Sequence, residues 1–174
     1  MDVETALFIG VDPGKSGGLA VIAGNGSVRA AVKMPETDRD VLDWLKQFGG
    51  ARAVLEQASS SYQQGVVSAF SFGRSCGMIR MALVATEIPF DYVTPARWQK
   101  ALGCRSGGDK NVTKRRAQDL FPSVRVTHAI ADALLIAEYC RRVSTGQLTP
   151  DDQREVVGQH PLSKRRDGTS EGEF

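Results

Sequence analysis

The chain has 174 residues, 41% of them hydrophobic, which suits one domain with a sizeable core and would be crowded for two. Its three cysteines form no CxxC pair and it has only two histidines, so neither a disulfide framework nor a structural zinc site is supported. The first residues are acidic, and no apolar run approaches the roughly 18 residues of a membrane span. We therefore expect a soluble cytoplasmic protein with no membrane partner.

The net charge of +2 hides one strongly basic segment. Residues 97–116 contain seven Lys and Arg against one Asp, a local charge of +6, whereas the rest of the chain is close to neutral or slightly acidic. Such a block is typical of a surface that binds phosphates. The alternative is a solvated basic face without a ligand.

The first predicted element is a hairpin that carries an acid in its turn. Residues 8–22 read FIGVDPGKSGGLAVI, in which two apolar runs flank Asp12 and a glycine-rich turn. Pro13 biases Asp12 toward extended backbone, and the glycines permit close approach of a ligand. Asp12 therefore stands at a strand end where it can meet a metal or a phosphate, although Asp, Pro and Gly are also ordinary turn residues.

The following segments extend the sheet. Asn25-Gly26 is a strong hairpin signal and predicts a third antiparallel strand over 27–34. A helix is predicted over 37–48, and the buried strand predicted over 52–57 brings a second acid, Glu56, to a strand end.

Residues 65–86 are apolar with only two charges, which predicts a helix that is apolar on nearly every side. Such a helix must be buried, either in the core or in a subunit interface. The remaining predicted elements are a strand over 89–94, helices over 95–102, 112–121 and 127–143, and a polar, mobile tail over 146–174.

This order of elements predicts an α/β fold with one mixed sheet of five strands, three antiparallel and then two parallel, and helices on both faces. A third acid, Asp132, lies in the last predicted helix among apolar residues, where an unpaired charge is costly. Three acids from distant segments can bind Mg²⁺ or Mn²⁺, and two such ions about 4 Å apart can drive phosphodiester hydrolysis. A salt bridge or an exposed helix face are the alternatives for Asp132.

Two further residues of the last helix were weighed for the same site. His128 lies about 40° from Asp132 around the helix and is a candidate ligand or general base, with a capping or surface role as the alternative. Glu138 lies about 120° away and is a poor candidate.

The segments FIGVDPGKSGGLAVI, VLEQ and IADALLIAEYCRR resemble, in order and spacing, the three acidic motifs of RuvC-type Holliday-junction resolvases. QQGVVSAFSFGRSCGMI and VTPARWQKALG are similar to the small bacteriophage-encoded branch of that family. The resemblance covers residues 7–143 and implies an RNase H-like nuclease domain over 1–145. It also implies a homodimer with two active sites that makes paired nicks in four-way DNA junctions with Mg²⁺.

By this resemblance Asp12, Glu56 and Asp132 are metal ligands, two ions per site, and Lys110 matches the family's lysine near the scissile phosphate. The family has a fourth acid or histidine three residues before the last Asp, where this chain has alanine. The adjacent His128 is therefore the candidate fourth ligand.

The resemblance also points to a DNA-binding surface. Some members carry an aromatic wedge three residues after the strand Glu, where this chain has Ser59, and Tyr62 is the candidate replacement by base stacking. We expect the basic segment to contact phosphates of the junction arms without reading bases, through Arg97, Lys100, Arg105, Lys110, Lys114 and Arg115.

Other functions were weighed against this one. A sugar-kinase or actin-like ATPase also opens with a strand, an Asp, a glycine turn and a strand, but it needs a second domain, so we expect no nucleotide cofactor. A broader branched-DNA or flap nuclease would use the same site chemistry. A non-catalytic junction-binding protein is the remaining alternative.

Overall fold

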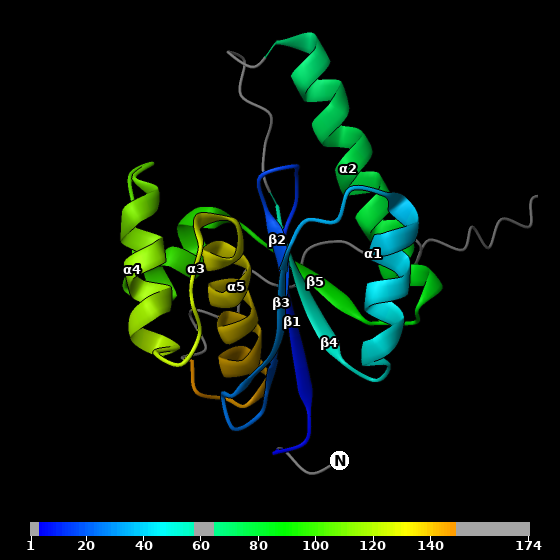
Figure 1. The fold of residues 1–174 in the computed structure, drawn as a ribbon. Coiled ribbons are helices and arrows are strands. Elements are labelled where there is room, and N and C mark those ends of the chain that lie inside the picture. Colours follow the sequence, from blue (N-terminus) through cyan, green and yellow to red (C-terminus); the bar gives the residue numbers. More distant parts are fainter. Residues whose placement is uncertain (1–3, 58–64, 149–174) are drawn as a thin grey trace, which may run out of the picture.

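The computed structural model describes residues 4–57 and 65–148, which form a sheet between two layers of helices (Figure 1). The strands are β1 (Leu7–Asp12), β2 (Gly18–Ala23), β3 (Val28–Lys33), β4 (Arg52–Glu56) and β5 (Phe90–Val93). The helices are α1 (Asp38–Leu45), the 3-10 helix η1 (Lys46–Phe48), α2 (Val66–Ala85), α3 (Pro95–Ala101), α4 (Lys110–Leu120) and α5 (His128–Ser144). Tyr62 and most of the predicted tail lie outside the described residues.

The five strands follow the order β3-β2-β1-β4-β5. β2 pairs antiparallel with both β1 and β3, whereas β4 pairs parallel with β1 and with β5. The predicted α/β fold, with three antiparallel and then two parallel strands and helices on both faces, is confirmed. The two parallel pairings matter most for function, because they bring the ends of β1, β4 and β5 to the same edge of the sheet.

Helices α3, α4 and α5 lie on one side of the sheet (Figure 1). The core on this side contains Phe8 of β1 and most of the apolar residues of α5. Gly10 allows the close approach of α5, because a Cβ at that position would collide with backbone atoms of Ala133 and Ala137. The packing therefore fixes the position of α5 directly against β1.

Helices α1 and α2 lie on the opposite side (Figure 1). The neighbours of Phe8 and Gly10 in β1, Ile9 and Val11, are completely buried in this second core. Side chains that alternate between two cores are typical of a strand covered on both faces, which explains why the sequence of β1 is apolar without a polar alternation.

The structure tests one half of the prediction for α2, whose apolar sequence predicts burial either in the core or in a subunit interface. Only Ile79, Ala82 and Leu83 are buried, whereas the N-terminal half of α2 projects beyond the sheet and leaves Phe70 76% exposed (Figure 1). Burial in the core of this chain therefore holds only for the C-terminal half of α2. The cause is length, because the sheet under α2 is too short to cover all 20 residues of the helix.

The start of α4 differs from the sequence prediction. It begins at Lys110 rather than at residue 112, because Asp109 caps the helix by accepting a hydrogen bond from the backbone N–H of Asn111. Lys110 is therefore part of a helix and not of the preceding glycine-rich loop. Among the described residues, no helix has both the length and the apolar character needed to cross a membrane.

Candidate active site

Asp12 and Glu56 lie next to each other at the edge where β1 and β4 end. The parallel register pairs Val11 with Leu55, so the two strands deliver the following acids to adjacent positions. Asp132 reaches the same region from the second turn of α5, which packs against β1. The structure thus brings together the three acids that were predicted from distant segments.

The three acids are half-buried and share an electrostatically unfavourable environment. Burial, the charge of Glu56 and the charge of Asp132 together raise the pKa of Asp12 to about 8. Burial also raises the pKa of Glu56 and the pKa of Asp132. At neutral pH and without a metal, Asp12 is therefore protonated and donates a hydrogen bond to Glu56. Mutual pKa perturbation of this kind is typical of functional sites.

Two buried side chains on the α3–α4 side support these acids. The indole N–H of Trp98 donates a hydrogen bond to Oε1 of Glu56 at 3.1 Å, and Thr113 bonds the carboxylate of Asp132. Both hydrogen bonds favour the ionised acid and so lower the pKa that burial raises. We did not predict either residue, because neither belongs to an acidic motif and only the fold brings them to the acids.

The donor set fits a hard divalent cation by its chemistry. Carboxylate oxygens are the ligands that Mg²⁺ and Mn²⁺ prefer, and Oδ1 of Asp132 is buried without a hydrogen-bond partner. Within residues 4–57 and 65–148, however, no three His, Cys, Asp or Glu side chains stand close enough together to form a ready metal site. Repulsion between the acids, relieved for Asp12 and Glu56 by a shared proton, is the physical reason we assign to this open arrangement.

The fold of the chain matches that of solved RuvC structures. The chain matches a Thermus thermophilus RuvC structure with a TM-score of 0.59 and 21% identity, over 82% of this chain and 98% of that chain. T. thermophilus RuvC in complex with a Holliday junction substrate matches with a TM-score of 0.60 and 22% identity, over 83% and 98%. The chain has the RuvC fold. The search found no matching protein-family model and no matching curated protein, and the bacteriophage branch stays a prediction.

On the RuvC fold of this chain, Lys110 and His128 lie near the acids. Lys110 is the first residue of α4, and its charge lowers the pKa of Asp12, Glu56 and Asp132 alike. His128 is the exposed first residue of α5, and its charge lowers the pKa of Asp132. The structure therefore places both predicted residues beside the carboxylates, while their chemical roles stay predictions.

The other predicted DNA-binding residues lie on or between α3 and α4. Lys100, Arg105 and Arg115 are exposed, whereas Arg97 and Lys114 are half-buried. Arg116, a further cation of this segment, has a structural role instead, because its Nε donates a hydrogen bond to the backbone carbonyl of Leu102 at 2.9 Å. The cations of this segment therefore belong to the helices α3 and α4 or to the loop between them, and their role in DNA binding stays a prediction.

Proposed function

We propose that this chain is a metal-dependent, structure-selective endodeoxyribonuclease that resolves four-way DNA junctions by paired phosphodiester hydrolysis. The observation that carries the proposal is the half-buried cluster of Asp12, Glu56 and Asp132. Burial raises the pKa of all three acids, Glu56 and Asp132 raise that of Asp12 further, and Asp132 raises that of Glu56, so ionisation of the cluster destabilises the fold unless a cation joins the acids. The similarity to RuvC supports the choice of substrate, because one of the matched structures holds a Holliday junction.

Asp12, Glu56 and Asp132 would hold Mg²⁺ or Mn²⁺, two ions per site, with His128 as the candidate further ligand or proton carrier. Bound ions would supply a reactive water and stabilise negative charge on the leaving oxygen of the phosphodiester. The hydrogen bond from Trp98 favours the ionised form of Glu56, and that from Thr113 favours the ionised form of Asp132, although burial raises the pKa of both acids. These two residues therefore prepare the acids for cation binding rather than react themselves.

Lys110 would attract the scissile phosphate. It is exposed at the N-terminus of α4, where the helix dipole also favours an anion, and its charge already acts on all three acids. The neighbouring cations Lys100, Arg105, Lys114 and Arg115, with Arg97, would hold the junction arms by their phosphates. Selection would then come from the geometry of the junction rather than from its sequence.

A homodimer is part of the proposal, since paired nicks need two sites. The exposed apolar residues of α2 share one side of the helix: Phe70 and Val84 lie two full seven-residue steps apart, and Gly77 lies midway between them. Phe70 is 76% exposed and Val84 is 57% exposed. A second copy of α2, which is apolar in the same way, fits this face, and Gly73 and Gly77 leave room for close helix contact.

Light scattering at micromolar concentration tests the dimer. We expect the mass of two chains for the wild type and of one chain for Phe70→Glu. Ser68→Glu introduces the same charge at an exposed position about 160° around the same helix from Phe70, and it is the control for charge alone. A wild-type monomer would contradict the dimer.

The test of the nuclease is cleavage of a labelled four-way junction and of the matching linear duplex, with Mg²⁺, by wild type and Asp12→Asn. We expect paired nicks in the junction alone and none with Asp12→Asn, which keeps the shape of the side chain but removes an anionic ligand. Cutting of flaps at a similar rate would favour the broader branched-DNA nuclease. Tight junction binding without cutting, in Mg²⁺ and in Mn²⁺, would favour the non-catalytic binding protein.

A further inference from the structure

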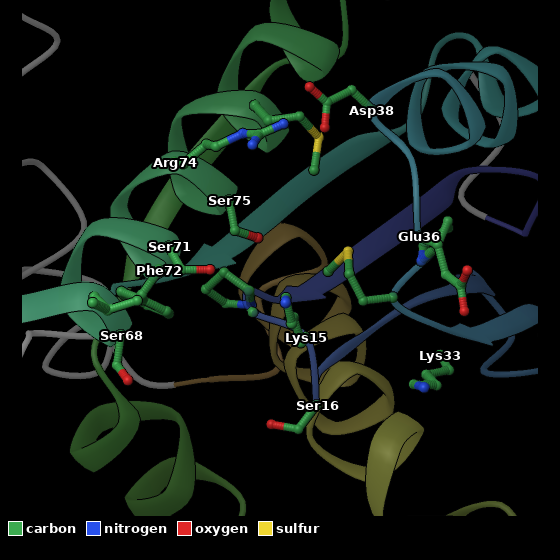
Figure 2. A pocket seen from close by; sticks show the side chains of 16 residues that line it. Lys15, Ser16, Lys33, Glu36, Asp38, Ser68, Ser71, Phe72, Arg74 and Ser75 are labelled. Atoms are coloured by element: carbon green, nitrogen blue, oxygen red, sulfur yellow. The ribbon is translucent and has the colours of Figure 1, made fainter. Parts of the chain in front are cut away.

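On the side of the sheet that carries α1 and α2, opposite α4 (Figure 1), a second polar site lies beside the turn after Asp12 (Figure 2). It is a pocket of about 1000 Å³ between the turn after β1, the connection from β3 to α1, and the N-terminal half of α2. No step of the proposed hydrolysis uses it. Its position follows from the hairpin, because the residues directly after Asp12, from Pro13 to Ser16, form one wall.

The pocket is rich in groups that bind phosphate. Lys15, Lys33 and Arg74 line it, and in the described part of the chain none of the three forms an ion pair. Serine hydroxyls add donors that can serve an anion, and Figure 2 shows those of Ser71 and Ser75 on the α2 wall, pointing to the side on which Lys15 lies. The acids of the pocket, Glu36 and Asp38, belong to the wall that leads into α1.

We propose that this pocket binds the sugar–phosphate backbone of the DNA strand that leaves the scissile phosphate on the α2 side. The inference rests on the proposed function. Lys15 follows Asp12 by three residues, so their Cα atoms are at most about 11 Å apart. Lys110 lies on the α4 side of the acids, and Lys15 lies on the side of α1 and α2. The strand would therefore cross the edge of the sheet with cations on both sides of the reacting phosphate.

The character of the pocket favours a strand over a small anion. Its volume is at the upper end of the roughly 300–1,000 Å³ range of ligand clefts, which is larger than a single phosphate needs. Phe72 and Met78 add apolar surface for sugar and base faces. Phe72 also packs on the turn: its ring lies 3.6 Å from the position of a Cβ on Gly14, whose φ of +104° favours glycine. The turn that presents Lys15 is thus held against the wall of the pocket.

The serine side of the pocket remains open in the proposed dimer, whereas Arg74, four residues after Phe70, borders the apolar face of α2. Ser68, Ser71 and Ser75 follow one another at spacings of three and four residues and mark one side of α2. Phe70 and Gly77 lie on the other side of the helix, away from these serines. A partner chain on the apolar face of α2 therefore leaves the serine side accessible to DNA.

The experiment measures junction binding in an Asp12→Asn background, which removes cleavage. Lys15→Ala and Arg74→Ala should each weaken binding about tenfold and lower the slope of log affinity against log salt by about one. Arg29→Ala removes an equally exposed charge from β3, outside the pocket, and is the matched control. Junctions with a neutral methylphosphonate at single positions beside the scissile phosphate then locate the contact. One such position should weaken binding by the parent and have no effect on Lys15→Ala.

The outcomes separate the two proposals. If the parent binds the junction no better than linear duplex, the proposed function fails. A second outcome is that the parent is selective for the junction, Lys15→Ala and Arg74→Ala bind like Arg29→Ala, and every methylphosphonate effect is unchanged. The strand then does not enter the pocket, and only this inference fails. Melting temperatures within about 2 °C of the parent for all three variants confirm that a loss of binding is not a loss of folding.

Discussion

Helix α5 carries two acids six residues apart, Asp132 and Glu138, and folding shifts their pKa values in opposite directions. Burial raises the pKa of Asp132, and one of its oxygens has no hydrogen-bond partner. Glu138 is only 4% exposed, but Arg141 and Arg142 donate hydrogen bonds of 2.6–2.8 Å to it and lower its pKa although burial acts to raise it. Glu138 is fully compensated within the chain, whereas Thr113, Lys110 and His128 offset the effect of burial on the pKa of Asp132 only in part.

This difference separates a structural acid from a functional one. The Arg141 Nη1 group also donates a hydrogen bond to the Gly24 carbonyl, so the Glu138 cluster ties α5 to the turn between β2 and β3. Near the other end of the helix, Asp132 instead faces Asp12 and Glu56, and its charge raises the pKa of both. A buried charge without a partner persists in a fold when a ligand supplies the partner, which is why we assign the cation to Asp132 and not to Glu138.

The largest expected effect is on catalysis. Asp132→Asn should lower the rate of junction cleavage by at least about a hundredfold, because it removes a ligand and charge stabilisation at the reacting phosphate. Glu138→Gln, the same chemical change on the same helix, should leave the rate within about twofold, since an amide oxygen still accepts hydrogen bonds from the arginines. Single-turnover cleavage with excess enzyme measures both. Equal losses would remove the distinction between the two acids.

Stability should respond in the reverse order. Glu138→Ala leaves two arginines without their buried acceptor and should lower the free energy of unfolding by about 3–5 kcal/mol. Asp132→Ala should cost much less in metal-free buffer, because it relieves repulsion at the acid cluster. Urea unfolding in EDTA gives both values. A larger loss for Asp132→Ala would mean that this carboxylate is already compensated within the chain.

The pH dependence of stability should also have opposite signs for Asp12, in the acid cluster, and for Glu138 on α5. The pKa of Asp12 rises from 3.8 to about 8 on folding, so protonation favours the folded state and this stability is lost as the pH rises from about 4 to about 8. Folding lowers the pKa of Glu138 below 4.5, so its contribution is present above that pH and is lost in acid. In EDTA, Asp12→Asn should therefore melt several degrees above wild type at pH 8, with the difference closing toward pH 4. No difference at pH 8 would contradict the raised pKa of Asp12.

Most of the fold and the three acids could be predicted from the sequence, because short apolar strands ending in Asp12 and Glu56 are local signals. The surface that covers α2 could not be predicted, because an apolar composition does not say whether residues of this chain or of a second copy pack against Phe70. The start of α4 did have a signal that we passed over, the capping residue Asp109. Trp98 looked like an ordinary core residue of a short helix, because its hydrogen bond joins residues 42 positions apart.

The smallest expected effect concerns Trp98, which compensates one acid of the cluster only in part. Trp98→Phe keeps an aromatic ring in the core but removes the N–H that donates to Glu56. Glu56 should then ionise less readily, so the Mg²⁺ concentration for half-maximal cleavage should rise about tenfold while the rate at saturating Mg²⁺ falls less. Trp44→Phe makes the same change in the opposite core, far from any acid of the site, and should leave the Mg²⁺ dependence unchanged. A fall in the saturating rate alone would instead mean that Trp98 supports the fold of the site and not the charge of Glu56.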